Sequence, residues 1–165
     1  MSIFAQTLLI HLRMRLKSLF FVTLAAVLVA ACDPAPKREE VPYITLEHYF
    51  FRNDAQIPTN PKIDTQEQFD SLFGMAAVMG QGGLPTAVDF TKQFVIAVVL
   101  PVTNQETEID DERLLYYKDL LGGTNLDFYY SIDRDEDTLS YSMQPILLIA
   151  VDRQYDVDKV YLNEM

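Results

Sequence analysis

The sequence contains a single cysteine, no tryptophan and only two histidines among its 165 residues. One cysteine cannot form a disulfide within the chain, so disulfide-stabilised folds are excluded. Basic residues are also scarce, since 13 lysines and arginines stand against 24 aspartates and glutamates, for a net charge of −11. This balance argues against nucleic-acid binding, which needs a concentrated basic surface to displace the counterions of the phosphates. The length corresponds to one domain.

Long hydrophobic segments are missing as well. The apolar run over residues 19–31 has thirteen residues, whereas a transmembrane helix needs about 20. Arg13, Arg15 and Lys17 precede this run, and no acidic residue lies upstream of it. A basic segment followed by a short apolar segment is typical of a secretory signal peptide. Translation from Met1 and translation from Met14 both preserve the pattern.

Small residues lead from the apolar run into the only cysteine. Val29-Ala30-Ala31-Cys32 resembles the lipobox of bacterial lipoproteins, in which the signal peptide is cut before the cysteine and the thiol carries a diacylglycerol. The resemblance implies that residues 1–31 are removed and that fatty acyl chains on Cys32 anchor the protein to a membrane. Two or three chains are needed for stable anchoring, because one chain gives only marginal binding. A buried free thiol after an ordinary signal peptide is the alternative.

Removal of residues 1–31 takes the basic side chains from 13 to 10 and leaves all 24 acidic ones, so the net charge falls from −11 to −14. Residues 33–40 contain two prolines, several charges and no large apolar side chain. This composition predicts an extended tether over residues 32–42, starting at the lipidated Cys32. Residues 43–165 then form a single domain, large enough to bury a core unaided. The expected location is the bacterial cell envelope, facing the periplasm or the cell surface, and Asp33 is compatible with either membrane.

The first half of this domain shows one strand pattern and one helix pattern. Residues 43–51 alternate, which predicts a strand with His48 on the same face as its apolar residues. Residues 65–68 read Thr-Gln-Glu-Gln, a capping-box pattern. Apolar residues then recur at helical spacing as far as Met79, and the glycines from Gly80 onward predict the end of this helix.

The second half reads as strands. Residues 94–100 form a continuous apolar, mostly β-branched run, which predicts a strand at the centre of a sheet with both faces buried. Residues 114–120 fit either a strand or a helix. Further strands are predicted over 126–133, 139–143, 146–151 and 157–162, with turns at 135–137 and 152–156. The expected fold class is α+β: a mainly antiparallel β-sheet, as a sandwich or a partly closed barrel, with one α-helix on its N-terminal side.

Catalytic chemistry has little support. Once Cys32 is acylated, the mature chain has no free thiol and keeps one histidine, His48. Zinc sites normally use several Cys or His ligands, and the position of His48 in the strand pattern favours a hydrogen-bonded structural role. No Gly-x-Ser-x-Gly or Ser-x-x-Lys motif occurs. We therefore expect no catalytic residue, no metal, no cofactor and no enzymatic activity.

Residues 133–137 begin like a calcium-binding loop, with acids at alternate positions. An EF-hand needs glycine at the sixth position and glutamate at the twelfth, and Thr138 and Gln144 stand there. A solvated acidic hairpin turn is therefore the preferred interpretation, and weak calcium binding is the minor alternative.

The order of apolar segments also resembles a known family. Ala87-Val88-Asp89-Phe90 leads into the run at 94–100, and Gln144-Pro145 leads into the run at 146–151. Over residues 65–162 this order is similar to the C-terminal domain of PrcB-type lipoproteins. The resemblance implies a domain that associates with a surface protease and stabilises it. The chain departs from that family at residues 101–107, where the family carries a Thr-Gly-Gly-Tyr-like loop, so no specific protease contact is transferred.

Together these observations favour a membrane-anchored, non-catalytic envelope lipoprotein that binds another envelope or secreted protein, with a protease to be stabilised or restrained as one candidate. Paired tyrosines at 116–117 and 129–130 should each place one ring outward and one inward, because neighbouring side chains of a strand point to opposite faces. The expected partner contacts are a loop over residues 104–112 and one outward tyrosine, that is, Asn104, Glu106, Glu108, Asp110 and Tyr129.

Two alternatives stay open. A glycan-binding lipoprotein would use exposed tyrosines beside carboxylates, although tryptophan, the preferred ring for stacking on sugars, is absent. A carboxylate-dependent glycosidase would use an acidic pair such as Asp110 with Glu112 or Asp135 with Asp137, in a cleft with the two acids about 5 to 10 Å apart.

Overall fold

The computed structural model describes residues 37–76 and 83–165. The expected signal peptide, Cys32 and the glycines at 80 and 82 therefore lie outside the described residues. Within that part of the chain, no helix is long and apolar enough to cross a membrane.

The elements, in chain order, are β1 (Arg38–Glu40), β2 (Tyr43–Thr45), β3 (Tyr49–Phe51), β4 (Lys62–Ile63), α2 (Gln66–Leu72), β5 (Phe73–Met75), β6 (Gln93–Val99), β7 (Thr103–Lys118), β8 (Thr124–Met143), β9 (Ile146–Asp152), a 3-10 helix (Arg153–Tyr155) and β10 (Lys159–Glu164).

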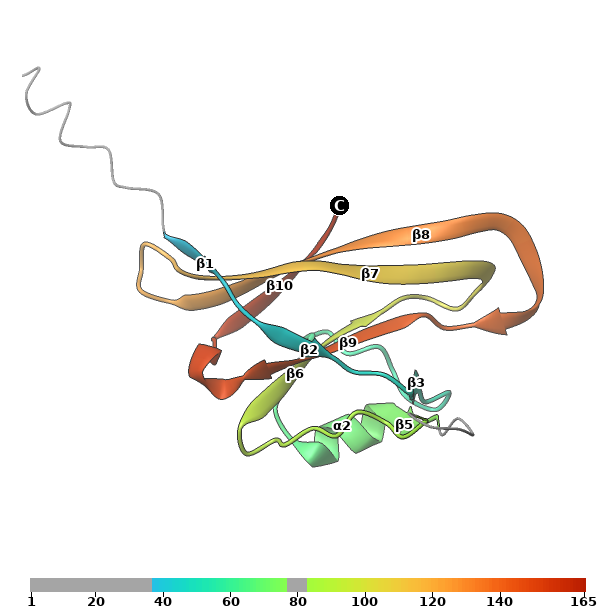
Figure 1. The fold of residues 1–165 in the computed structure, drawn as a ribbon, viewed down its shortest axis with the longest axis horizontal. Helices are drawn as coiled ribbons and strands as arrows, with labels where there is room; N and C mark the ends of the chain where they lie inside the picture. Colours follow the sequence, from blue (N-terminus) through green and yellow to red (C-terminus); the bar gives the residue numbers. More distant parts are fainter. Residues whose placement is uncertain (1–36, 77–82) are drawn as a thin grey trace, which may run out of the picture. The chain divides into compact units, whose positions relative to one another are not determined.

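The strands form open sheets (Figure 1). One sheet has the order β1-β7-β8-β10, which we call sheet A, and a second has the order β2-β9-β6-β4, which we call sheet B. β3 and β5 make a small separate pair. Every pairing is antiparallel except that of β8 with β10. The predicted α+β class with a mainly antiparallel sheet is confirmed.

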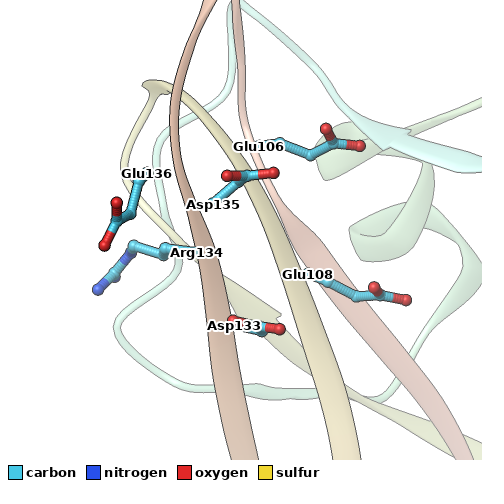
Figure 2. Close-up of a pocket in the computed structure, with 6 residues that line it drawn as sticks. All are labelled: Glu106, Glu108, Asp133, Arg134, Asp135 and Glu136. Carbon is cyan, nitrogen blue, oxygen red and sulfur yellow. The ribbon is translucent and has the colours of Figure 1, made fainter.

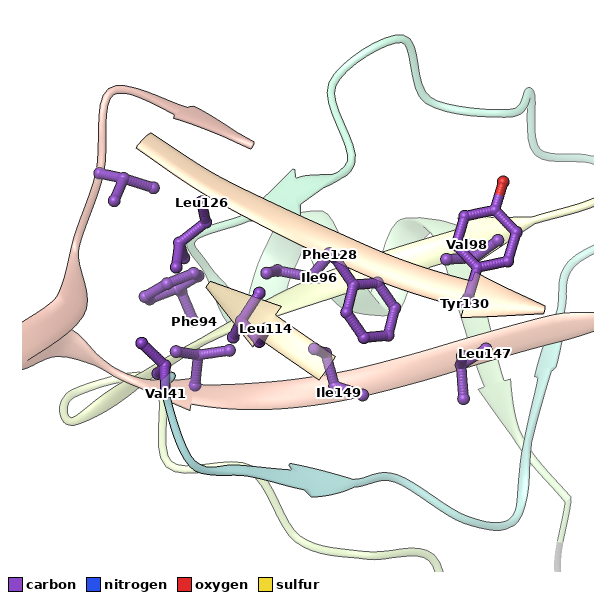
Figure 3. Packing of buried hydrophobic residues seen from close by; sticks show 12 residues of the cluster. Val41, Phe94, Ile96, Val98, Leu114, Leu126, Phe128, Tyr130, Leu147 and Ile149 are labelled. Atoms are coloured by element: carbon purple, nitrogen blue, oxygen red, sulfur yellow. The ribbon is translucent and has the colours of Figure 1, made fainter. Parts of the chain in front are cut away.

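One core lies between the two sheets, as in a sandwich (Figure 3). Alternate residues of β7 and β8 point inward from sheet A, and alternate residues of β6 and β9 point inward from sheet B, because side chains of a strand change face at every residue. The fully buried members include Leu114, Leu126 and Phe128 of sheet A and Phe94, Ile96 and Ile149 of sheet B.

A second core covers the other face of sheet B. Val95, Ala97, Leu148 and Ala150 are buried there against α2 and the β3–β5 pair, with Phe69 as the buried residue of the helix. Because β6 and β9 are covered on both faces, their sequences are apolar without interruption. The predicted central strand over residues 94–100 is confirmed, as is the second apolar strand.

The single strand predicted over residues 43–51 is wrong. It divides into β2, which pairs with β9, and β3, which pairs with β5. His48 lies between them with φ 64, a left-handed conformation that ends the strand alternation. The expected apolar face is therefore lost, since Leu46 is buried while Ile44 is 52% exposed.

The predicted helix begins where expected but ends early. The Thr65 side chain accepts a hydrogen bond from the Gln68 backbone N–H at 3.2 Å, which confirms the N-cap. The helix stops at Leu72 because Phe73 is extended, with φ −122 and ψ 145. Phe73 then pairs with Phe51 across the β3–β5 ladder. Tertiary pairing thus outweighs the helical spacing of the apolar residues at 73–75, and Met79 lies outside the described residues.

β7 and β8 form one long hairpin, so two sequence predictions are wrong. Residues 104–112 are strand, not loop, and residues 135–137 continue β8 instead of forming a hairpin turn. A bulge explains the second error: Asp135, Glu136 and Asp137 lie opposite Glu106 alone, between the pairs Gln105–Thr138 and Thr107–Arg134.

The chain reverses at residues 119–123 instead. There the Asp119 carboxylate accepts hydrogen bonds from the backbone N–H groups of Leu121 and Gly123, both at 2.9 Å. Gly122 adopts φ 86, which a side chain would disfavour.

The domain begins before residue 43. β1, at residues 38–40 of the expected tether, pairs antiparallel with residues 115–117 of β7. Val41 follows it, with 1% of its surface exposed, and donates its backbone N–H to the Leu114 carbonyl at 2.9 Å. The tether expected over residues 32–42 is therefore shortened, because its last part belongs to sheet A and to the core.

Candidate functional site

The far half of the β7–β8 hairpin concentrates charge of one sign. We call residues 103–112 and 131–143 the acidic ribbon. Its only basic residue is Arg134. The acidic residues it contains are Glu106, Glu108, Asp110, Asp111, Glu112, Asp133, Asp135, Glu136 and Asp137.

Four of the predicted contact residues lie on the ribbon. Asn104, Glu106, Glu108 and Asp110 are all exposed and alternate with less exposed neighbours along β7. Cross-strand pairing places Asp110 opposite Ser131, which is two residues from Tyr129 on β8. Because residues two apart share a face, Asp110 and Tyr129 lie on the same outer face of sheet A, the face turned away from sheet B. The structure therefore brings these predicted contacts onto one surface.

A cavity of about 400 Å³ opens on the ribbon (Figure 2). Both strands contribute to it, and every lining side chain is charged and belongs to an exposed residue. The lining residues are Glu106, Glu108, Asp133, Arg134, Asp135 and Glu136.

The carboxylates of this cavity are not neutralised by neighbouring cations. In residues 37–76 and 83–165, none of the lining residues takes part in an ion pair. Glu108 stands directly opposite Asp133 in the ladder, and like charges in that position destabilise a sheet. The arrangement favours a positively charged ligand, which would relieve the repulsion.

General acid–base catalysis fits this cavity poorly. A catalytic carboxylic acid needs an apolar pocket that raises its pKa, whereas the cavity's carboxylates belong to exposed residues. Within the described ranges, no group of three or more Asp, Glu, His or Cys side chains is placed to hold a metal ion. The cavity is thus suited to binding charge across a broad surface.

A second polar cluster lies on the same outer face, nearer β1. Its centre is Asp127 of β8, which is only 7% exposed. Arg38 of β1 reaches across β7 and donates to the Asp127 carboxylate at 3.0 Å and to the Tyr129 hydroxyl at 3.3 Å. Tyr117 donates its hydroxyl to Asp127 at 3.4 Å. Burial, followed by the charge of Asp127, raises the pKa of Tyr117.

Two guanidinium groups cover tyrosine rings in this Asp127 cluster. Arg38 lies 4.9 Å from the centre of the Tyr117 ring, and Arg113 lies 4.7 Å from that of Tyr129. Such cation–π contacts hold the rings in place. They also occupy ring faces that a sugar would need for stacking.

Each tyrosine pair divides between the two faces of sheet A, as predicted. Tyr130 is a buried member of the core between the sheets, and Tyr116 packs against that core. Tyr129 and Tyr117 lie on the outer face and join the Asp127 cluster.

Asp111 connects the ribbon to the first strand of sheet B. Its carboxylate accepts a hydrogen bond from the Thr45 hydroxyl at 3.0 Å. Burial, followed by the charge of Asp111 and a hydrogen bond to it, raises the pKa of Tyr43 to about 12. β2 therefore bounds the exposed edge of β7 at this point.

Among the described residues, His48 has one charged side chain within ion-pair distance. The nearest acidic group is Glu47, 3.9 Å from its ring, on an exposed side chain. This geometry gives the imidazole no partner that would orient it as a general base.

The sequence did not indicate Arg38, Tyr117 or Asp127 as a cluster. Alternation around Leu126 and Phe128 signals that Asp127 points outward. Its burial depends on side chains from β1 and β7, and that long-range pairing leaves no local pattern in the sequence.

Comparisons with known proteins returned no relative: no family model, no curated protein and no solved structure matches the chain.

Proposed function

We propose that this protein is a membrane-anchored, non-catalytic lipoprotein of the bacterial cell envelope that binds another envelope or secreted protein through the outer face of its acidic ribbon. The lipobox-like segment ending at Cys32 supports the anchor. The acidic ribbon supports protein binding, with Asn104, Glu106, Glu108 and Asp110 as contacts on β7 and Tyr129 at their border.

A single observation carries the proposal. Six charged side chains line a cavity of about 400 Å³ without ion pairs between them in the described part of the chain. Folding places Glu108 opposite Asp133, and a cationic ligand would reduce the repulsion between these like charges. The partner accordingly presents a basic surface. A surface protease, as in the PrcB-type lipoproteins, is one candidate for it.

Site-specific photocrosslinking on intact cells tests this function. A photoreactive amino acid replaces Glu108 in the ribbon of the full-length protein, and a matched protein carries it at Glu67, an exposed position of α2. The expected result is one saturable protein adduct from position 108 and none from position 67. The same adducts from both positions would show that the ribbon only meets abundant bystanders.

Glycan binding is the second candidate, because Tyr117 and Tyr129 lie beside the Asp127 carboxylate. The guanidinium groups over both rings reduce the stacking surface. Titration with bacterial cell-wall and host glycans distinguishes this candidate. Binding that is lost on Tyr129→Ala, while the crosslinked protein adduct is absent, would replace the first proposal.

A further inference from the structure

The free edge of β7 is the feature that extends the proposed function. β7 pairs with β8 along one side over its length, but on its other side β1 covers only residues 115–117. Val41 adds one hydrogen bond, to the Leu114 carbonyl. In residues 37–76 and 83–165, no strand pairs with residues 104–110 on that side. An open strand edge exposes backbone N–H and C=O groups that bind a further strand.

We propose that an extended, lysine- or arginine-rich segment of the partner protein binds by adding a strand to this edge, alongside residues 104–110 of β7. The inference rests on the proposed function, since it specifies how the partner binds the same ribbon. Strand addition of this kind derives its affinity from main-chain hydrogen bonds and its specificity from alternate side chains.

The geometry of the edge suits a strand of ordinary length. Residues 104–110 span about 20 Å at roughly 3.3 Å per residue, which matches the usual length of a strand in a protein. β1 already lies on the same edge of β7 further along (Figure 1). The edge therefore accepts a strand, and the added segment would lie in line with β1. The contact of Thr45 with Asp111 bounds the free stretch at the end nearer β1.

Charge decides which strand the edge accepts. Glu106, Glu108 and Asp110 lie on the exposed face beside the edge, and Asp133 lies across from Glu108. In an added strand, alternate side chains would stand next to these acids, where opposite charges stabilise cross-strand pairs. A second copy of this chain would bring the same acids to the contact and be repelled. A cationic segment of a different protein is therefore the occupant.

The test uses the mature protein, purified in neutral detergent, and two synthetic peptides. One peptide alternates lysine and threonine over ten positions. The other has the same sequence and charge, but alternate backbone amides carry a methyl group, which removes donors on one edge. We expect the first peptide to bind and to slow hydrogen exchange at residues 104–110. We expect the methylated peptide to bind at least about tenfold more weakly, because it loses main-chain hydrogen bonds to the strand edge.

A pair of charge variants completes the experiment. E106Q/E108Q should weaken binding of the unmethylated peptide about tenfold, whereas E47Q/E67Q removes the same charge elsewhere and should leave binding unchanged. Equal binding of the two peptides would overturn the inference, because it would show that charge alone is recognised. Self-association through residues 104–110, or peptide protection confined to other strands, would overturn it as well.

The outcomes separate this inference from the proposed function. A saturable adduct from position 108 in cells, combined with equal binding of the two peptides, retains the function and rejects strand addition. Selective binding of the unmethylated peptide without any cellular adduct retains strand addition and rejects the function.

Discussion

At the scale of single residues, polar side chains decide how the first strand is held. Asp127 is nearly buried, and Arg38 is the cation beside it. A carboxylate removed from water needs such a partner, because burying an unpaired charge is costly. The alternation of β8 predicts that Asp127 points away from the core, but the sequence alone does not show which strand supplies its partner. Arg38 lies in a segment whose prolines and charges predict a tether.

Substitution of Arg38 by Met should destabilise the domain, because it leaves Asp127 without a cation while preserving much of the packing over Tyr117. The free energy of unfolding should fall measurably, but by less than for a fully buried pair, since the Arg38 side chain is 46% exposed. Urea denaturation measures it. Arg52→Met removes an arginine from an exposed pair with Asp54 and should cost less than about 0.5 kcal/mol. Equal losses would mean that Arg38 acts only as a surface charge.

A network of ion pairs joins Lys62 to the loop after β9. Lys62 contacts Asp64 at 3.2 Å and also pairs with Asp156, and Arg153 lies 3.5 Å from both carboxylates. Burial alone would raise the pKa of Asp156, but the hydrogen bond and charge of Lys62 outweigh it and lower that pKa below its ordinary value of 3.8. The ionised form of Asp156 is therefore favoured in the folded protein.

This shift predicts a pH dependence of stability. Because the folded pKa of Asp156 is depressed, its contribution is present above about pH 4 and is lost as the pH falls through the lower folded value. Asp156→Asn should reduce the free energy of unfolding by about 1 kcal/mol or less at pH 7, since the carboxylate is half exposed. The difference should shrink toward pH 2. Denaturation of both proteins across this range measures it, and a constant difference would contradict ion pairing as its source.

At the scale of elements, burial on both faces made β6 and β9 predictable. Their apolar runs are long and continuous, and no other element within residues 37–76 and 83–165 has that pattern. The errors occurred where tertiary pairing prevailed over local pattern. β5 takes over residues that fit a helix, and His48 interrupts a segment that alternates like one strand. In β8, the bulge at residues 135–137 gives a strand the composition of a turn. The contacts predicted within residues 104–112 lie on the acidic ribbon, but the sequence predicted a loop there, because charge alone does not distinguish a loop from an exposed strand.

The N-cap Thr65 is a local sequence signal that correctly predicted where α2 begins. Thr65→Ala removes the hydroxyl that accepts the Gln68 N–H. The expected cost is about 1 kcal/mol in the free energy of unfolding, typical of N-cap losses. Thr65→Ser retains the acceptor and should restore most of it, so urea denaturation of the two variants separates capping from packing. If serine and alanine are equally destabilising, the methyl group of Thr65 is what matters.

At the scale of the whole molecule, the mature protein divides into a neutral interior and a charged periphery. Sheet B is enclosed on both faces, whereas sheet A is covered by sheet B on one face only. The free face carries the acidic ribbon at one end and the Asp127 cluster with β1 at the other. Composition predicts a strongly acidic protein, but only the long-range pairing of β7 with β8 places nine of its acids together on the acidic ribbon. The anchor proposed at Cys32 would hold the protein at a membrane, where envelope partners are found.

The anchor leads to the broadest prediction. The chain has a single cysteine, so acylation at any other thiol is impossible. Cys32→Ala in the full-length protein should therefore abolish incorporation of labelled fatty acid completely, and it should move the protein from the membrane fraction to the soluble fraction. The Arg38→Met variant is the control, because it perturbs the domain close to the tether but keeps the thiol, and it should label like the parent protein. Labelling that persists in Cys32→Ala would show that the segment 29–32 is not a lipobox. Loss of labelling with membrane association retained would instead mean that the uncut apolar segment 19–31 or the domain itself holds the protein at the membrane.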